Sequence, residues 1–340
     1  MSALADDIGA EQRVMDLQRQ NETLQRQLGR AKHKSEDLVD AVHAGARDAA
    51  IIVGTPSPVP RPALDRRKGG AEYAVLHLTD LHFGKLTESF NSEIADERVR
   101  AVIAKTMRLA DIQRADHPVK KCILLLGGDL IENVSIFPGQ AWEVDSAVFA
   151  QVFKAAAAIE AAVLSLLGHF DTVDVYEVWG NHGRIGRKHA GDSPRPDNWD
   201  RIAGQIARDR LDKQQRRLTW HETDKVWYAI VQAGNWSALL IHGDSIRQFG
   251  GNTPHAGIQK ALNKYAAGVV GHFNDALVGH FHTSMEIPIA NGGRAWVTPS
   301  IESGSAFAAE FMGSLGKPAQ RLVFVDPERG RVTAEYLVYC

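Results

Sequence analysis

The sequence predicts an α/β fold in which two β-sheets pack together with helices on the outside, preceded by a separate N-terminal helical segment. Three observations give this prediction. Strand-like and helix-like segments alternate between residues 73 and 213, strand-like segments then follow one another towards the C-terminus, and residues 1–53 carry a heptad pattern that the rest lacks. With 340 residues and 44% hydrophobic content, the chain is long enough for one large domain or two small ones.

The N-terminal segment, residues 1–53, carries apolar positions at alternating spacings of three and four, which is typical of a coiled coil. The pattern runs through Val14, Leu17, Asn21, Leu24, Leu28, Ala31, Ser35, Leu38 and Val42. Asn21 occupies an a position, where a buried amide favours paired helices in register. We therefore expect a homodimer formed through residues 1–53. A single helix lying on the domain surface and a disordered segment remain alternatives, because Gly29, Ala31 and Ser35 weaken the seam.

A proline-rich stretch, residues 54–71, follows the heptads. It places four prolines within residues 54–62, which keeps the backbone extended and prevents a helix. We interpret it as a semi-rigid linker between the N-terminal helix and one domain at 72–340.

The domain begins with alternating elements and ends with consecutive strands. Helices are expected at 93–115, 145–167, 198–213 and 255–267. Strands are expected at 74–79, 121–127, 173–179, 218–222, 226–232, 236–241, 275–279, 284–289, 294–298, 321–326 and 331–338. Alternation in the first half and consecutive strands in the second indicate two packed sheets with helices outside.

Five short blocks in this domain place potential metal ligands at the ends of apolar runs. They are Thr79-Asp80-Leu81-His82, Gly128-Asp129, Gly180-Asn181-His182, His242-Gly243-Asp244 and Gly279-His280-Phe281-His282. Strands that end in carboxylate, amide and imidazole groups build one mixed oxygen and nitrogen site at a sheet edge. These ligand types suit two divalent metals about 3.5–4 Å apart, which activate water and clamp a phosphoryl group.

The ordered set of blocks resembles the calcineurin-like metallophosphoesterase superfamily over residues Tyr73 to Ile301. In its first block, Leu76 to Lys85, it is closest to the DNA-repair exonuclease branch of that superfamily. The resemblance implies a metallophosphoesterase-type β-sandwich flanked by helices, with the ligands on loops at one edge.

The resemblance also implies a role for each matching residue. Asp80, His82 and His282 would hold the first metal, Asp129 would bridge the two ions, and Asn181, His242 and His280 would complete the second. His182 would be the general acid that protonates the leaving group. Mn²⁺ is the ion we expect first, although Mg²⁺, Fe²⁺ and Zn²⁺ accept the same ligands.

The sequence departs from the superfamily directly after His182. The common pattern continues with Asp or Glu, whereas this chain has Gly183 and then Arg184. The sequence does not choose between Asp244 and another acid as the group that orients His182. Arg184 is expected to bind a substrate phosphate through its two-pronged guanidinium, together with Arg187.

The substrate class is predicted from motif and charge. The exonuclease-like first block and the ten Lys or Arg against five Asp within residues 184–217 favour nucleic acid, and hence a nuclease. The formal net charge of −2 argues against a protein that coats DNA through bulk charge, and the basic segment also fits a solvated helix. Two alternatives remain: a phosphoesterase for a small nucleotide or other small phosphoester, and an assembly protein with vestigial catalysis.

The cellular location is predicted from what the sequence lacks. Cys122 and Cys340 do not suggest a disulfide framework, no uninterrupted run of 18 apolar residues occurs, and the first residues lack a signal-peptide pattern. We therefore expect a cytoplasmic protein without a membrane partner.

Overall fold

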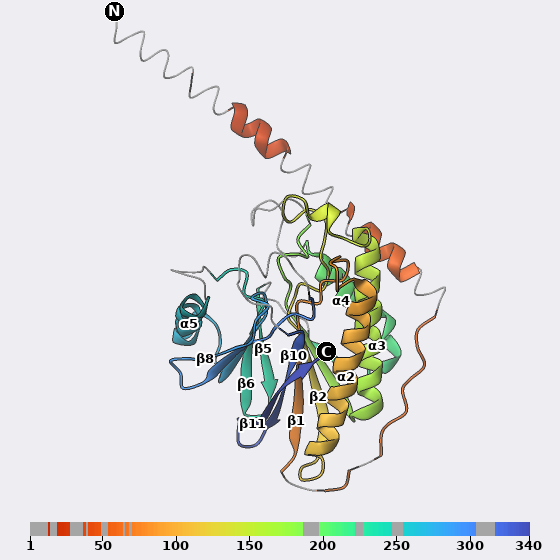
Figure 1. Ribbon diagram of the computed structural model, residues 1–340, viewed down its shortest axis with the longest axis vertical. Coiled ribbons are helices and arrows are strands. Elements are labelled where there is room, and N and C mark those ends of the chain that lie inside the picture. The colour runs from red at the N-terminus through yellow and green to blue at the C-terminus, as the bar shows by residue number, and fades with distance from the viewer. Residues whose placement is uncertain are drawn as a thin grey trace, which may run out of the picture.

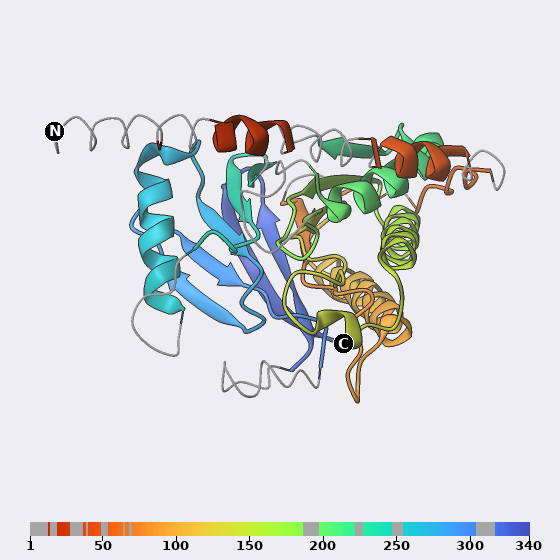
Figure 2. The same ribbon diagram turned by 90° about the horizontal axis from the view of Figure 1, so that it is seen from above.

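Two stacked β-sheets with helices on their outer faces form the body of the protein, and this confirms the predicted fold class (Figure 1, Figure 2). The computed structural model describes residues 70–185, 197–221, 227–246, 254–303 and 317–340. Before residue 70 it describes residues 13, 19–27, 37–38, 40–48, 54–63 and 65–67. Every expected strand is present, and each boundary lies within two residues of the prediction.

The first sheet has six strands in the order β11-β10-β1-β2-β3-β4. Their bounds are β1 (Glu72–Leu78), β2 (Val119–Leu126), β3 (Thr172–Glu177), β4 (Leu218–His221), β10 (Ala319–Asp326) and β11 (Arg331–Tyr339). Strands β1 to β4 pair in parallel, whereas β10 runs antiparallel to both β1 and β11. Alternate side chains of β1 point to opposite faces, so Leu76 packs under the helices and Val75 packs between the sheets.

The second sheet has five strands in the order β5-β6-β7-β9-β8. Their bounds are β5 (Tyr228–Ala233), β6 (Trp236–Ile241), β7 (Asp275–Val278), β8 (Met285–Pro288) and β9 (Arg294–Val297). Between the two sheets lie Trp236 and Trp296, both fully buried. Their indole N–H groups donate to Asp275 (2.7 Å) and Glu335 (2.8 Å), so burial leaves neither of these two donors unpaired.

The helices cover the outer faces, with α2, α3 and α4 on the first sheet and α5 beside the second (Figure 1). Their bounds are α2 (Ser92–Gln113), α3 (Val148–His169), α4 (Trp199–Arg210) and α5 (His255–Lys264), with short turns η1 (Gln140–Trp142), η2 (Asp212–Gln214) and η3 (Tyr265–Val269). By length and composition α3 alone among the described helices could cross a membrane. Its most apolar window is 61% buried against the rest of the protein, as in a core helix.

The described parts of the N-terminal segment are helical at 19–27 and 40–48. Leu24 and Leu38, two seam positions, are 62% and 41% exposed. Nearer the domain the helix is docked: Ala46 is buried, Val42 packs against the main core, and Nε2 of His43 lies 3.1 Å from Oδ2 of Asp209. The last turns therefore lie on the domain surface. The paired coiled coil stays a prediction, and most of its seam falls outside the described residues.

The proline-rich stretch is fastened to the domain by two side chains. Gln214 accepts from the Val59 amide (3.0 Å) and donates to the Ser57 carbonyl (2.9 Å). Arg217 donates to the Val59 carbonyl (2.8 Å). This linker therefore runs along the domain as a bound, extended strap.

The topology places the five predicted blocks together. Strands β1, β2 and β3 run in parallel in the first sheet, and β6 and β7 run in parallel in the second. Each of the five blocks follows the carboxyl end of one of these strands. Ligands at the carboxyl ends of parallel strands meet at one edge, which is where open α/β sheets place their sites.

Candidate metal centre

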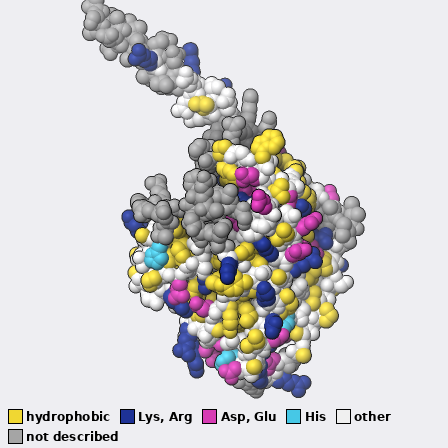
Figure 3. Space-filling view, in the orientation of Figure 1, with side chains coloured by type: hydrophobic (Ala, Val, Ile, Leu, Met, Phe, Trp, Pro, Cys, Tyr) yellow, Lys and Arg dark blue, Asp and Glu magenta, His cyan; other side chains and the backbone are white. Residues whose placement is uncertain are grey.

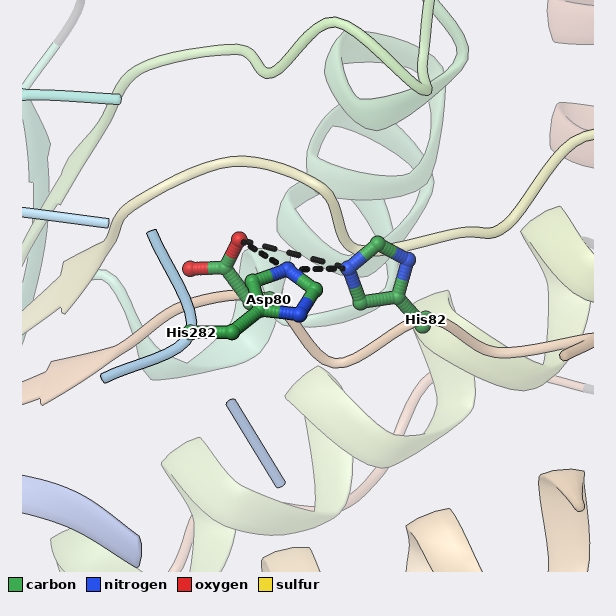
Figure 4. Close-up of side chains that lie close together, drawn as sticks. All are labelled: Asp80, His82 and His282. Atoms are coloured by element: carbon green, nitrogen blue, oxygen red, sulfur yellow. Dashed lines mark hydrogen bonds and ion pairs between the residues drawn. The ribbon is translucent and has the colours of Figure 1, made fainter. Parts of the chain in front are cut away.

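The first ligand group consists of Asp80, His82 and His282, which we call the Asp80 group (Figure 4). The Nε2 atoms of the two histidines lie 3.1 Å apart. Oδ1 of Asp80 lies 3.2 Å from Nε2 of His282 and 4.0 Å from Nε2 of His82. All three donor atoms therefore face one small volume, although their residues come from loops 200 positions apart.

Two of these three separations, 3.1 and 3.2 Å, fit a bound cation. A metal about 2.0–2.2 Å from each of its nitrogen and oxygen ligands keeps neighbouring donor atoms roughly 3.0–3.4 Å apart at ordinary coordination angles. Two imidazole nitrogens at 3.1 Å meet that condition. A carboxylate beside two imidazoles is a donor set that Mn²⁺, Fe²⁺ and Zn²⁺ all accept.

The second ligand group consists of Asp129, His242 and His280, which we call the Asp129 group. Nε2 of His242 lies 3.0 Å from Oδ2 of Asp129 and 3.2 Å from Oδ1 of Asn181. The backbone N–H of His280 donates to both carboxylate oxygens of Asp80, each at 3.0 Å. The two groups are thus parts of one centre, and the structure brings together all seven residues that the sequence predicted as ligands.

Unusual backbone conformations mark the same residues. Among the residues that the structure describes, the non-glycine residues with positive φ are Asp80, His82, Asp129, Asn133, His280 and His282, with φ between 47° and 70°. Five of these six are predicted ligands. This left-handed region costs of order 1–3 kcal/mol per residue and persists where the surrounding structure enforces it, often at functional sites. Asp80 and His82, two residues apart, both adopt this conformation and both belong to the same ligand group.

Close backbone approach accounts for a glycine in these motifs. A Cβ on Gly180 would overlap Oδ1 of Asp129. The loop after β3 can therefore pass directly over the Asp129 carboxylate only if residue 180 has no side chain. The glycine of this motif is a packing requirement of the centre.

Two buried glutamates contact the Nδ1 atoms of the histidines of the Asp80 group. Oε2 of Glu132 lies 2.7 Å from Nδ1 of His82, and Oε1 of Glu302 lies 2.8 Å from Nδ1 of His282. A carboxylate at Nδ1 fixes the tautomer in which Nε2 is free for a metal, and it makes the imidazole a stronger ligand. Lys85 lies between the two carboxylates, with Nζ 3.5 Å from each. None of these three roles was predicted from the sequence.

His182 shares Glu132 with His82. Its Nδ1 lies 2.9 Å from the Glu132 carbonyl oxygen and 3.3 Å from Oε2 of that glutamate. Burial alone would lower the pKa of His182, but the carboxylates of Glu132 and Asp129 raise this pKa to about 9. The acid that orients His182 is therefore Glu132, three residues after Asp129 in the chain.

The pKa values of the ligands reflect the density of charge. Burial opposes ionisation, yet Asp129 raises the pKa of His242 to about 10, and Glu302 and Asp80 raise the pKa of His282 well above its usual value. Burial and the neighbouring His242 lower the pKa of His280 to about 4. Buried carboxylates that stabilise positive charge on imidazoles also stabilise a cation in the same place.

The structure gives less support to the two predicted phosphate ligands, Arg184 and Arg187, than to the predicted metal ligands. The Arg184 guanidinium is paired with Asp244, so this cation already has a carboxylate partner. Arg187 lies outside the described residues. Arg210 pairs with Glu160, and Arg217 donates to the linker. These two side chains of the basic segment 184–217 therefore stabilise the fold. Positive and negative side chains are also mixed over the helical side (Figure 3).

Comparisons with known proteins give only distant likenesses. No protein-family model matches the chain, and no curated protein matches it. A predicted phosphoesterase from Streptococcus pneumoniae is 10% identical over 79% of this chain and 99% of its own, with a TM-score of 0.32. A dimetal phosphatase from Danio rerio is 11% identical over 78% and 98%, with a TM-score of 0.37. Vps29 from Entamoeba histolytica, solved with zinc, is 10% identical over 78% and 99%, with a TM-score of 0.32.

Proposed function

We propose that this protein is a dinuclear metal-dependent phosphoesterase that hydrolyses phosphodiester bonds in nucleic acid, and thus a nuclease. One observation carries the proposal. Two adjacent groups of carboxylate and imidazole donors converge at the carboxyl edge of two sheets, and they are joined through the bond from the His280 amide to Asp80. Two divalent ions held there would supply a nucleophile from water at neutral pH and neutralise charge on the phosphoryl oxygens.

The chain's own residues supply the proton and the orientation. His182 is the general acid: the Glu132 carboxylate beside its ring stabilises the protonated imidazole, which donates a proton to the leaving oxygen. Glu132 fixes the ring by its contacts at Nδ1, which leaves Nε2 free to act. The His82 and His182 rings meet in a T-shaped contact with centroids 4.7 Å apart, so the acid lies directly beside the Asp80 group.

An exposed tryptophan on the short turn whose Gln140 contacts His182 supports a substrate that carries bases. Gln140 is buried and donates to the Glu132 carbonyl (2.7 Å), and its amide nitrogen lies 3.4 Å from Nδ1 of His182. Two residues further along the same short turn, Trp142 is 89% exposed. The turn is thus held next to the general acid through Gln140, and it exposes the Trp142 indole to solvent. Stacking of a base on such a ring contributes about 1–3 kcal/mol.

A second candidate function is hydrolysis of a small phosphoester. The pairing of Arg184 with Asp244 favours it, because this pairing removes one cation that a polymer backbone would otherwise contact. Arg210 and Arg217 are likewise held by structural partners.

The deciding experiment is hydrolysis of end-labelled single- and double-stranded DNA and RNA in Mn²⁺, beside bis-p-nitrophenyl phosphate. The matched control is Asp129→Asn, which removes one carboxylate charge and keeps the side-chain shape. A product ladder absent from the control supports a nuclease. Cleavage of the small diester alone supports the second candidate, and no cleavage of any substrate contradicts both.

Trp142→Ala and Trp142→Phe separate the two candidates further. For a nuclease, the alanine variant should raise KM for an oligonucleotide about tenfold, and the phenylalanine variant should restore much of the affinity. Neither should change hydrolysis of bis-p-nitrophenyl phosphate. Ile112→Ala, which also removes an exposed apolar side chain (57%), is the control.

The identity of the ions, the oligomer and the location are parts of the same proposal. Mn²⁺ remains our first expectation, and reactivation of chelator-treated protein by Mn²⁺, Mg²⁺, Fe²⁺ and Zn²⁺ separately tests it.

The exposed seam residue Leu24 suits a homodimer through residues 1–53. Leu24→Asp should convert a dimer to a monomer in sedimentation, and an unchanged mass would contradict it. Cys122 and Cys340 are both free, which fits a reducing cytoplasm; recovery of the tagged protein outside the cytoplasm would contradict this location.

A further inference from the structure

We propose that Asp200 is a positioning residue of the metal centre, which reaches from α4 to hold the loop after β2 against the loop after β3. The first of these loops carries Asp129, and the second carries Asn181 and His182. This inference rests on the proposed metal site. Asp200 would touch neither ion nor substrate, and it would act through the backbone of the residues that do.

The Asp200 carboxylate accepts hydrogen bonds from two loops at once. Oδ2 accepts from the backbone N–H of Asp129 (2.8 Å) and from that of Gly180 (2.9 Å). Oδ1 accepts from the N–H of Leu130 (3.0 Å) and, more weakly, from that of Ile131 (3.4 Å). The side chain belongs to a residue that is only 1% exposed, so no solvent competes for these donors.

The negative charge matters to this arrangement. Four backbone N–H groups pointing at one place form an anion site, and a charged acceptor bonds them about twice as strongly as a neutral one. Without the carboxylate these buried donors would be left unpaired, and no solvent would replace the lost hydrogen bonds. An amide side chain cannot substitute, because its NH₂ group would face backbone donors in place of Oδ1 or Oδ2.

The start of α4 is built into the same loop on its other side. The Asn198 side chain caps α4 by accepting from the Asp200 N–H (2.8 Å), and it donates to the Gly180 carbonyl (3.0 Å). The Trp199 N–H donates to the Gly183 carbonyl (2.6 Å). The first turn of α4 and the loop after β3 therefore form one rigid unit.

Gly183 leaves the room for this contact. A Cβ at that position would overlap Oδ1 of Asn198 and lie 2.9 Å from Cγ of Asp200. This chain has Gly183 where the superfamily pattern continues with Asp or Glu, and the space beside the loop holds a carboxylate that comes from α4.

The two ligand groups should depend on Asp200 unequally. Asp129 is bonded to Asp200 through its own N–H, and Gly180 precedes Asn181. Asp80 is held instead by the His280 N–H and by the hydroxyl of Thr79 (2.7 Å). Removal of the Asp200 charge should therefore weaken the ion of the Asp129 group more than the ion of the Asp80 group, which shares only the bridging Asp129 carboxylate with it.

The test is Mn²⁺ titration calorimetry of chelator-treated full-length protein, with melting followed by circular dichroism. Asp200→Asn should weaken one of two ions by about 10–100-fold, the usual effect of losing a group that orients ligands. Asp326→Asn is the matched control: this buried carboxylate accepts from the N–H groups of Glu328 (3.0 Å) and Arg329 (2.9 Å) at the opposite end of the first sheet. The control should lower the melting temperature alone.

Two single-site backgrounds assign the weakened ion. In His282→Ala, which cripples the Asp80 group, Asp200→Asn should weaken the remaining ion. In His242→Ala, which cripples the Asp129 group, it should weaken the remaining ion by a clearly smaller factor. Equal losses in the two backgrounds, or no loss in either, would overturn the inference.

A second variant guards against a failure of Asp200→Asn to fold. Gly183→Ala keeps the carboxylate but pushes Asn198 and Asp200 away from the loop. It should weaken the same ion by a smaller factor, and unchanged affinity for both ions would contradict the role. If the wild-type protein binds two ions but cleaves no phosphoester, the proposed function fails while this inference stands.

Discussion

The Asp80 group and the Asp129 group have similar ligands but different support. In the Asp80 group, Nδ1 of each histidine contacts a carboxylate. Glu132 lies 2.7 Å from His82, and Glu302 lies 2.8 Å from His282. In the Asp129 group, Nδ1 of His242 lies 2.9 Å from the backbone carbonyl oxygen of Gly127. No carboxylate stands behind that ring among the described contacts.

This difference predicts unequal ions. A carboxylate at Nδ1 increases the negative charge that reaches the metal through the imidazole, so the Asp80 group should bind its cation more tightly. The Asp129 group relies on a neutral carbonyl and the neutral amide of Asn181, so its ion should exchange more readily. One centre would thus combine a resident ion with a more labile one.

The largest expected effect comes from His182, the general acid, which shares Glu132 with His82 of the Asp80 group. His182→Ala should lower kcat on a DNA substrate by about 10²–10⁴-fold, because the leaving alkoxide then departs without a proton. Both ions should still bind. Since p-nitrophenolate needs no proton to leave, bis-p-nitrophenyl phosphate should lose much less. An equal loss on the two substrates would mean that His182 orients the substrate and is not the acid.

The two carboxylates that contact the histidines of the Asp80 group, Glu302 and Glu132, can be replaced one at a time. Glu302→Gln should weaken the ion of the Asp80 group by about 10–100-fold and leave the other ion unchanged. Glu132→Gln should do the same and should also impair catalysis, because Glu132 serves both His82 and His182. Mn²⁺ calorimetry provides the affinities. Equal weakening of the two ions by Glu302→Gln would remove the basis of the comparison.

The pKa of His182 gives a pH test on metal-free protein. Because Glu132 and Asp129 raise this pKa to about 9 when the protein is folded, the imidazolium stabilises the fold fully below about pH 6.5. That stabilisation is lost as the pH rises through about 9. Glu132→Gln should lower the pKa towards its ordinary value, as NMR titration of the ring protons would show. An unchanged pKa would point to Asp129 as the dominant partner.

The sequence predicted the framework of this centre well, for a physical reason. Strand ends are set by local patterns, and the ligands follow them within a few residues, as Asp80 follows β1 and His242 follows β6. The order of strands in the sheets was not predicted. β10 lies between β11 and β1, and such long-range pairing leaves no local signal.

The supporting residues were missed for the same reason. Glu132 is close to Asp129 in the chain, but its contact with His182 is decided by the loop after β3. Glu302 meets His282 from 20 residues away, and nothing in its neighbours distinguishes it from a surface glutamate. Arg184 was predicted as a phosphate ligand, and only the fold shows its pairing with Asp244. Ligands can be recognised by type and spacing, whereas the groups that orient them depend on three-dimensional proximity.

The smallest expected effect on activity concerns Lys85, which joins the two supporting carboxylates. Burial alone would lower the pKa of Lys85, but Glu132 and Glu302 raise it, so the ammonium stays charged between them. In metal-free protein, Lys85→Met should cost about 1–3 kcal/mol, because two buried carboxylates lose their shared cation. A bound ion in the Asp80 group supplies positive charge through His82 and His282 to the same carboxylates. The loss in melting temperature should therefore shrink when Mn²⁺ is added, and kcat should change only a few-fold. If the loss in melting temperature is the same with and without Mn²⁺, the carboxylates are not electrically coupled to the Asp80 group, and the proposed difference between the two ions loses its cause.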